Sequence, residues 1–573
     1  MRASRTVSHA FLRLLSALCL LTSTFCLSSC ARHEPRADLV ILNGGEPESL
    51  DPAIISGQLD GRVVQSMFEG LMRFDPVTAK PVPGLAERVN VSPDGKAYTF
   101  YLRSNALWST GEPVTSEDVV YSWQRLLDPA TAGDYAGNLY YIKNAEEFNT
   151  GRTNAAAGQR FIASDVAVKA LDLRTVQVEL VNPTPFFLDL CAFHTGAITQ
   201  KKVVEKYGDR WLNARPLPCN GPYTLEYWRI HDKIRIRRNP LYWDNANTQN
   251  ELVDFLPIDS STTAMNIFQT GGADILWDKN LVPTELLDAL LPRPECHTFD
   301  MLASYFYRYN VTRPPFNDVR VRKALAMAID KKRLVQKISK AGEKVSTHIT
   351  PDGIAGYKPP EGVGYDPDRA RQLLKEAGFP GGQGFPTFKY LFNTAELHKQ
   401  IAVEMQEMWQ RELGIKMELH QTEWKVYLAA QSKLDYDLSR SSWVGDYNDP
   451  NTFLDMFMSE NGNNRTGWKN PRYDELMREA NQQSDQNKRA QLLQEAETLL
   501  VREDLPVVPI YLYVGVNFWD PKKIEGVYLN ILDVHPVNAI RNKSRKSNVE
   551  GRRPAEPVAD TNVSGVNPQG AIR

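Results

Sequence analysis

One short stretch near the end of the chain gathers residue types that suit ligand binding. Residues 440–450 hold a cation, an indole, a glycine and an anion, in the order Arg440-Ser-Ser-Trp443-Val-Gly-Asp446-Tyr447-Asn-Asp-Pro450. An apolar, strand-like run precedes them and a proline turn ends them. A ligand with an ammonium group at one end and an apolar body would match this set, and a short peptide has both. The alternative is a surface loop with ordinary charges.

Motifs that would indicate catalysis or metal binding are not found in the sequence. It contains no GxSxG, HExxH or P-loop pattern, and no His/Cys cluster has zinc spacing. Asp446, Asp449 and Glu423 could form the acid pair of a hydrolase, but nothing fixes their spacing. Calcium binding at residues 446–449 is a further alternative, which Pro450 and the missing glycine and distal glutamate disfavour. We therefore predict a binding protein that is not an enzyme and holds no metal or cofactor.

Residues 1–30 have the pattern of an export signal. Three arginines precede an apolar run at 14–27 that is too short to span a bilayer. The run ends in Leu27-Ser-Ser-Cys30, which resembles the lipobox of bacterial lipoproteins. We predict a lipoprotein signal peptide and a protein exported to the periplasm or cell envelope, held at the membrane by acyl chains on Cys30. The alternative is a signal peptide without lipidation.

Composition limits the remaining classes. The formal net charge is −2, which argues against nucleic-acid binding. The mature chain is longer than one hydrophobic core usually serves, so several lobes are expected. Beyond Cys30, three cysteines remain: Cys191, Cys219 and Cys296. In an oxidising compartment we predict a disulfide between Cys191 and Cys219, because both lie in apolar, strand-like sequence of one region; the alternative is that all three are free.

Local signals place the expected helices and strands. Thr115 with Asp118 has the pattern of a capping box and predicts the start of a helix. The alternating residues 223–228 and 233–237 predict a hairpin. After residue 300 the rhythm is strand, helix, strand, with one long helix capped by Thr394 and stopped by Gly414. This rhythm predicts α/β structure with a parallel sheet.

Further motifs along the chain carry a family resemblance. They are Ser49-Leu-Asp-Pro52, Phe68-Glu-Gly-Leu71, Trp108-Ser-Thr-Gly-Glu-Pro-Val-Thr115, Asn220-Gly-Pro-Tyr223, Pro315-Phe-Asn-Asp-Val-Arg320, Asn393-Thr-Ala-Glu-Leu-His398, Glu423-Trp-Lys425 and the 440–450 stretch. In this order they resemble the oligopeptide-binding proteins of bacterial ABC importers, which belong to family 5 of the extracellular solute-binding proteins. The likeness runs from about residue 39 to 530.

The resemblance implies an α/β, two-jaw periplasmic binding protein fold of class II, peptide type. Mixed sheets flanked by helices would form two jaws and an additional third lobe. By analogy the first lobe comprises 38–68, 194–302 and 510–543, the additional lobe 69–193, and the opposing jaw 303–509. Residues 544–573, poor in large apolar side chains, are predicted to be a disordered C-terminal tail.

The same resemblance implies roles for single residues. Asp446 would pair with the α-ammonium of a peptide, and Trp443 and Trp424 would line side-chain pockets. Arg440 and His398 would meet the C-terminal carboxylate. The backbone around residues 442–444, and around Ser56, Gly57 and Gln58 on the other jaw, would hydrogen-bond the peptide main chain. Val444, Gly445 and Tyr447 complete the predicted ligand site.

Each role has a structural alternative. Asp446 could cap the turn that ends at Pro450, and either tryptophan could be plain core. Arg440 could end its strand in a salt bridge, and His398 could be a solvated histidine on a helix.

Several positions depart from the family pattern. Gln431 stands where the best-known relatives carry an arginine, Ser56 where they carry a glutamate, and Asn138 near where they carry a tyrosine. Ala303 and Val444 replace two cysteines that those relatives join in a disulfide.

Function follows from the resemblance as an expectation. The chain would be a monomer that captures short peptides with a free N-terminal amine in a closing cleft. It would deliver them to an ABC permease with a cytoplasmic ATPase. The alternatives are a specialised carrier of cell-wall (murein) peptides or another small ligand, and an anchored hydrolase.

Overall fold

The computed structural model describes residues 34–154, 158–352, 354–483 and 485–545. The predicted signal peptide with Cys30 lies outside the described residues, as does the predicted tail after Arg545. Across the described ranges, no helix is both long and apolar enough to cross a membrane.

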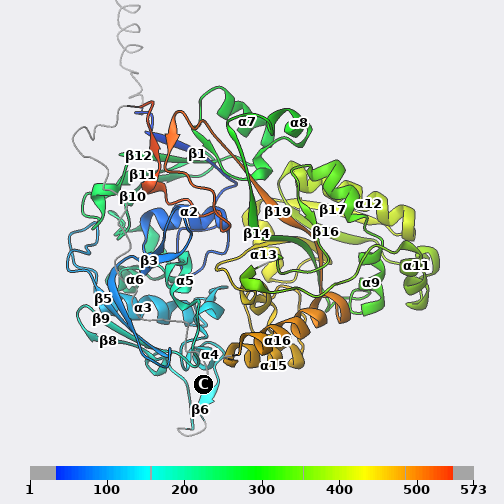
Figure 1. Cartoon of the computed structure of the whole chain (residues 1–573), viewed down its shortest axis with the longest axis horizontal. Helices are drawn as coiled ribbons and strands as arrows, with labels where there is room; N and C mark the ends of the chain where they lie inside the picture. Colours follow the sequence, from blue (N-terminus) through cyan, green and yellow to red (C-terminus); the bar gives the residue numbers. More distant parts are fainter. Residues whose placement is uncertain (1–33, 155–157, 353, 484, 546–573) are drawn as a thin grey trace, which may run out of the picture. The chain divides into compact units, whose positions relative to one another are not determined.

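An 11-stranded mixed sheet organises the part of the chain that begins at Asp38 (Figure 1). Ten strands follow one another in the order β10 (Tyr223–Arg229), β11 (Lys233–Arg238), β12 (Leu252–Pro257), β1 (Leu39–Gly44), β13 (Ile275–Leu276), β19 (Val507–Trp519), β14 (Cys296–Tyr309), β18 (Leu438–Val444), β16 (Phe388–Asn393) and β17 (Met417–Thr422). The short β15 (Lys344–Val345) pairs with β19. We call β10, β11, β12, β1 and β13 the β1 side of the sheet, and β18, β16 and β17 the β18 side.

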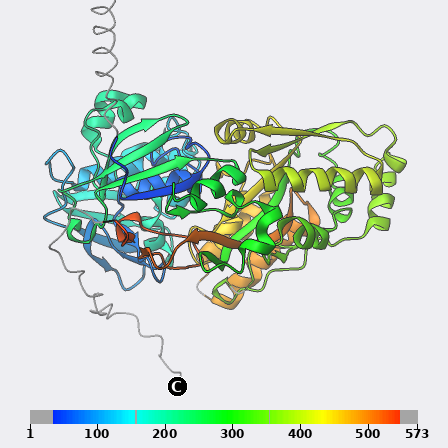
Figure 2. The ribbon, with the colours of Figure 1, turned by 90° about the horizontal axis from the view of Figure 1, so that it is seen from above.

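Two long antiparallel strands, β14 and β19, join the two sides (Figure 2). One end of β19 pairs with β13 through Phe518 and Trp519, and β14 pairs with β18 from Ala303 to Tyr309. The two strands are hydrogen-bonded to each other along most of their length. Any change in the angle between the two sides must therefore bend or twist this shared ladder.

A second, four-stranded sheet lies beside helix α3 (Ser116–Leu127), in the order β4 (Ala86–Val91), β5 (Ala97–Leu102), β9 (Thr175–Glu179) and β8 (Val168–Asp172). The predicted capping box is confirmed: the Thr115 side chain accepts from the Asp118 amide, and Asp118 Oδ2 accepts from the Thr115 amide at 3.0 Å. Inside the helix, Val119 and Trp123 are fully buried.

The predicted hairpin and α/β unit are also confirmed. Strands β10 and β11 pair antiparallel, whereas β16 and β17 pair parallel across α12 (Glu396–Leu413). Helix α12 ends at Gly414, which has a left-handed φ of 69°. Its N-cap is Ala395 rather than Thr394, whose hydroxyl donates instead to the Thr422 carbonyl.

The other elements connect and cover these sheets. The longer helices are α2 (Gln58–Met67), α5 (Phe187–Ala192), α6 (Lys201–Tyr207), α7 (Ser261–Gln269), α9 (Val319–Met327), α11 (Pro367–Glu376), α13 (Trp424–Ser432), α15 (Pro471–Gln482) and α16 (Gln486–Thr498). The shorter helices are α4 (Ala145–Asn149), α8 (Leu287–Leu290), α10 (Lys331–Arg333) and α14 (Asn451–Leu454). The two-to-three-residue strands are β2 (Met72–Phe74), β3 (Pro81–Pro83), β6 (Thr153–Asn154), β7 (Gln159–Arg160), β20 (Ile524–Glu525) and β21 (Arg541–Asn542).

Separate groups of buried apolar side chains hold the two sides of the large sheet. One surrounds β1, α2 and β12, and another surrounds α9, α12 and β16. The group around the four-stranded sheet extends without a break to Trp443 and Phe453. The lobe boundaries expected at 38–68, 69–193 and 303–509 stay a prediction.

The predicted disulfide between Cys191 and Cys219 is wrong. Both thiols are free and buried, and Cys296 is free as well. Cys191 lies on α5 and packs into the group around the four-stranded sheet, whereas Cys219 packs with the β1 group. The two cysteines thus lie in different groups of buried side chains, and their similar apolar sequence surroundings do not indicate that they are close in space. Burial also raises the pKa of the Cys219 thiol to about 12, so this thiol stays protonated.

Candidate functional site

A cavity of about 630 Å³ lies between α2 on the β1 side and strand β18 with α13 on the other. Residues from both sides and from β19 line it. Ten of the eleven predicted ligand residues are among them: Ser56, Gly57, Gln58, His398, Trp424, Arg440, Trp443, Val444, Gly445 and Asp446. The exception is Tyr447, which is fully buried, stacks on Phe186 at 4.2 Å and donates to Asp455.

Strand β18 presents a free edge to this cavity. It pairs with β14 over its whole length, but with β16 only at Leu438 and Ser439. The amide of Gly445 donates to Leu302 (2.7 Å), so the opposed residues Ala303 and Val444 form a pair without direct hydrogen bonds. Alternation along an antiparallel ladder then turns the amide and carbonyl of Val444, and those of Ser442, away from β14.

Asp446 lies immediately beyond this edge and has no ion pair with any described residue. Its side chain is buried, and its own amide donates to Thr452 Oγ1 at 3.0 Å. Burial raises the pKa of this carboxyl well above its usual range; Asp455 raises it further, and the nearby Asn138 amide lowers it. The protein alone thus supplies no cation for a carboxylate that needs one.

The turn that follows uses a different carboxylate. Asp449 accepts from the Asn451 amide and is held by both arms of Arg489, at 2.7 and 2.9 Å. Turn capping, the structural alternative for Asp446, is therefore carried out by Asp449. The carboxylate of Asp446 remains available to the cavity.

The two predicted tryptophans lie on the cavity wall. Trp443 stacks on Tyr135, with ring centroids 5.7 Å apart and planes at 27°. Trp424 is the first residue of α13 and faces α2, where a Cβ added to Gly57 would lie 2.9 Å from the indole carbon Cζ2. Gly57 is thus needed for this close approach. The indole N–H of Trp443 is buried and has no acceptor among the described residues, so it is available to a ligand, whereas the Trp424 indole lies beside the Asp60 carboxyl.

Arg440 projects from β18 and forms no salt bridge with the described residues. Its guanidinium donates to Tyr513 Oη at 2.8 Å and to Asn393 Oδ1 at 3.3 Å, and its carbon Cζ lies 5.0 Å from the ring centroid of Tyr305. Nε has no partner in the described chain. A salt bridge at the strand end, the alternative reading, is not found within that part. A buried guanidinium held by neutral groups suits a ligand carboxylate.

His398 is fully buried on α12, so it is not a solvated helix histidine. Neither ring nitrogen has a hydrogen-bond partner within the described ranges. Burial lowers the pKa of His398 well below its usual range, and Arg440 and Lys279 lower it further. The ring is therefore neutral at pH 7 and offers one N–H donor and one acceptor to the cavity.

Gln431, which stands where the family resemblance implies an arginine, does not line the cavity. It is buried, and its amide donates to the Arg440 carbonyl (2.9 Å) and to Ser439 Oγ (2.8 Å). These bonds fix the backbone of β18 just before its free edge.

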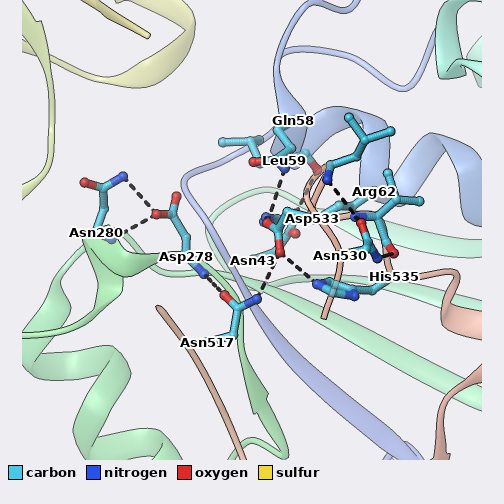
Figure 3. Close-up of polar contacts among 12 residues, drawn as sticks. Asn43, Gln58, Leu59, Arg62, Asp278, Asn280, Asn517, Asn530, Asp533 and His535 are labelled. Atoms are coloured by element: carbon cyan, nitrogen blue, oxygen red, sulfur yellow. Dashed lines mark hydrogen bonds and ion pairs between the residues drawn. The ribbon is translucent and has the colours of Figure 1, made fainter. Parts of the chain in front are cut away.

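Several cavity residues were missed from the sequence. His194 lies on the wall beside Gly61, Tyr135 lies on the wall near His194, and Asp533 lies on a loop after β20. Figure 3 shows Asp533 held by Arg62 (2.9 Å) and His535 (2.7 Å). No local motif marks these positions, because each depends on contacts between segments far apart in sequence. Asp533 also has a left-handed φ of 52°, a backbone conformation that its sequence neighbours do not indicate.

Comparison with known proteins agrees with this architecture. Residues 80–465 match the family described as bacterial extracellular solute-binding proteins, family 5 middle. The periplasmic oligopeptide-binding protein OppA of Salmonella typhimurium is 38% identical over 494 residues, covering 84% of this chain and 88% of that protein. The periplasmic murein peptide-binding protein MppA of Escherichia coli is 36% identical over 486 residues, covering 83% and 88%.

Solved structures give the same result. An oligopeptide-binding protein of Borrelia burgdorferi superposes with a TM-score of 0.83 at 31% identity, covering 88% of this chain and 100% of that chain. Haemophilus influenzae OppA in complex with the peptide RPPGFSPFR gives 0.81 at 32% identity, covering 88% and 98%.

Two MppA structures distinguish conformations. The Escherichia coli murein tripeptide-binding protein gives a TM-score of 0.82 at 33% identity, covering 88% of this chain and 98% of that chain. An unliganded open form of MppA gives only 0.58 at 34% identity, covering 88% and 97%. Because the identities are nearly equal, the difference lies in conformation, and the present structure is far from the open form. With the family pattern matched over more than half of its length, and relatives above 30% identity along most of it, the chain belongs to the bacterial extracellular solute-binding proteins of family 5.

Proposed function

We propose that this protein captures short peptides with a free N-terminal amine and delivers them to the membrane permease of an ABC importer. Asp446 is the observation that carries the proposal. It is a buried carboxylate on the cavity wall with no cation from the described protein. A peptide α-ammonium would supply the charge and three donors to this carboxylate.

Main-chain recognition would follow from the free edge of β18. An extended peptide beside Ser442 and Val444 would add one strand to the sheet, with backbone hydrogen bonds that do not depend on side chains. On the opposite wall, Ser56, Gly57 and Gln58 would contact the same peptide. Such a site binds many sequences.

The other end of a short peptide would meet Arg440. Its guanidinium has no carboxylate partner in the described chain, and the neutral His398 can donate a further hydrogen bond. Arg440 lies within β18 and Asp446 lies two residues beyond its end, and the six positions between them limit their separation to about 20 Å. This limit suits a peptide of a few residues.

The test combines one substitution with one ligand change. Asp446→Asn keeps the size of the side chain and removes its charge. We expect it to weaken binding of a tripeptide such as Ala-Lys-Ala by about 3–5 kcal/mol, the scale for breaking a buried charge pair. Isothermal calorimetry would measure the dissociation constants of the free and the N-acetylated tripeptide for both proteins.

Acetylation serves as the control for the anchor. In the wild type, acetylation should reduce the binding free energy by about as much as the substitution does. In Asp446→Asn, acetylation should cause little further loss of binding free energy, because both changes remove the same charge pair. Equal affinity of wild type and variant for the free tripeptide would contradict the assignment. Native mass spectrometry of the purified protein would show which peptides it carries.

A murein peptide is a second candidate ligand, favoured by the similarity to the murein peptide-binding protein of Escherichia coli. Competition would separate the two candidates. A murein tripeptide that displaces Ala-Lys-Ala at equal or lower concentration would favour the specialised role. Displacement only at far higher concentration would favour general peptide capture.

Membrane attachment is proposed from the lipobox-like sequence that ends in Cys30. Acyl chains on this cysteine would hold the exported protein next to its permease. Cys30→Ser should then release the protein from membranes into the soluble envelope fraction. The mass of the N-terminal tryptic peptide of the wild type would show whether acyl groups are present.

A further inference from the structure

The described residues that line the cavity carry an excess of negative charge. Seven of them are carboxylates: Glu69, Asp75, Asp244, Asp259, Asp278, Asp446 and Asp533. Four are lysine or arginine: Arg62, Arg73, Lys279 and Arg440. A cavity with this balance favours a positively charged ligand.

Three of the four cations are already paired within the protein. Arg62 binds Asp533 at 2.9 Å and Arg73 binds Asp244 at 2.8 Å. Lys279 contacts Glu343, which lies outside the cavity lining, and its charge also acts on the neighbouring Asp278, although it forms no ion pair with that carboxylate. Arg440 alone among these cations lacks a carboxylate in the described part, so the cavity has few means to neutralise its remaining acids.

Asp278 is one of these remaining acids. Figure 3 shows its carboxylate bound on one oxygen only: Oδ1 accepts from the Asn280 amide and from Asn280 Nδ2, each at 2.9 Å. Oδ2 accepts no hydrogen bond from the described residues, and no ion pair reaches the side chain there. The nearby Arg62 is committed to Asp533. Burial raises the pKa of Asp278, and Arg62 and Arg440 lower it less.

The backbone that presents Asp278 is strained. Its φ is 116°, which is unfavourable for a residue with a Cβ. The amide of Asp278 donates to Asn517 on β19 at 3.2 Å, and Asn517 in turn donates to Asp533 at 3.0 Å. The network in Figure 3 thus holds a conformation that local preference disfavours.

We propose that Asp278 is a specificity-determining residue that receives a basic side chain of the bound peptide. This inference rests on the proposed function, in which Asp446 and Arg440 take the two terminal charges. Those two contacts neutralise a peptide without ionised side chains and leave Asp278 unpaired. A lysine or arginine side chain would add the missing cation and bind the free Oδ2.

A structural role for Asp278 is separable from this one. Asp278 also caps the short 3₁₀ helix Lys279–Leu281 through the Asn280 amide. Asparagine is about as good a cap as aspartate, so Asp278→Asn keeps the cap and removes only the charge. Asp259→Asn is the matched control, because Asp259 also lines the cavity but is exposed to solvent.

The experiment measures dissociation constants of four tripeptides by calorimetry: Ala-Ala-Ala and the three variants with one lysine. We expect the wild type to prefer one lysine position over Ala-Ala-Ala by about tenfold, the effect of roughly 1.4 kcal/mol. Asp278→Asn should abolish this preference and bind Ala-Ala-Ala like the wild type. Asp259→Asn should keep the preference.

The outcomes separate the two proposals. If no tripeptide binds the wild type, the proposed function fails. If tripeptides bind but lysine gives no preference at any position, or Asp278→Asn keeps that preference, the role of Asp278 fails alone. If Asp278→Asn weakens the binding of Ala-Ala-Ala as much as the binding of the lysine peptides, the role of Asp278 is structural only.

Discussion

At the scale of single residues, environment decides what identical side chains do. Asp446 and Asp449 lie three positions apart in one loop. Asp449 is paired with Arg489 and caps a turn, whereas Asp446 faces the cavity without a cation from the described residues. The first is a structural residue and the second a proposed ligand anchor, although neither residue type nor spacing distinguishes them.

Asp60 gives a testable pH dependence. It is fully buried in the first turn of α2, where Oδ1 accepts from the Glu48 amide at 2.5 Å. Burial raises the pKa of Asp60 to about 8, against about 3.9 in an unfolded chain. The folded protein then holds a proton that the unfolded chain releases, so the contribution to stability is lost as pH rises from about 4 to about 8.

Urea unfolding of wild type and Asp60→Asn between pH 5 and 8 would measure this effect. The stability of the wild type relative to the variant should fall by up to about 1.4 kcal/mol per pH unit, because the variant carries no proton to lose. Asp259→Asn, at an exposed position, should run parallel to the wild type. Parallel curves for Asp60→Asn as well would show that Asp60 is not protonated in the folded state.

At the scale of elements, the register of β14 and β18 explains two departures from the family pattern together. Ala303 and Val444 stand opposite each other in a pair without direct hydrogen bonds. Such pairs hold their Cα atoms about 4.5 Å apart, within the range of about 4.4–6.8 Å that disulfides span. The cysteine pair that the family resemblance implies for these two positions could therefore form a disulfide, and the pair Ala303 and Val444 leaves no unpaired thiol beside the free edge of β18.

The double substitution Ala303→Cys and Val444→Cys should restore a disulfide. Under oxidising conditions we expect the new cysteines to pair and to raise the free energy of unfolding by about 2–4 kcal/mol. Thiol titration of the denatured protein should find the same number of free thiols as in the wild type. Two additional free thiols would contradict the register, and the reduced form of the same variant is the control for stability.

At the scale of the whole molecule, contacts between distant segments hold the cavity closed. Arg465 binds both Ser56, which precedes α2, and Asp134, which follows α3. Trp424 packs against Gly57, and Thr284 donates to Gln400 of α12 at 2.5 Å. These contacts join segments that the ladder of β14 and β19 would otherwise allow to swing apart.

Arg465→Leu tests this closure. The side chain of Asp134 keeps 23% exposure, so the loss should be smaller than for a fully buried pair, about 1–2 kcal/mol. We expect this loss of binding free energy to appear mainly as a faster dissociation rate of a bound tripeptide, with little change in the association rate. Stopped-flow fluorescence would measure both rates. Unchanged release would show that Arg465 does not contribute to closure, and Arg472→Leu, at an exposed salt bridge, is the control.

The features that the sequence predicts correctly are those whose chemistry is local. The capping box at Thr115, the stop at Gly414 and the parallel unit of β16 and β17 depend on neighbours along the chain. Features that depend on contacts between distant segments are not predictable in this way: the predicted Cys191–Cys219 disulfide is wrong, and no motif marks Tyr135 or Asp533 as cavity residues. Ten residues of the cavity wall were predictable, and only because family motifs mark β18, α12, α13 and the start of α2.

The free edge of β18 also bears on solubility. Unpaired strand edges are templates on which other chains add strands and aggregate. Here Ser442 and Val444 line a cavity of about 630 Å³, which is too small for the edge of another folded sheet. The enclosure of this edge thus protects an incomplete sheet from self-association, and an open, ligand-free protein would be its most aggregation-prone state.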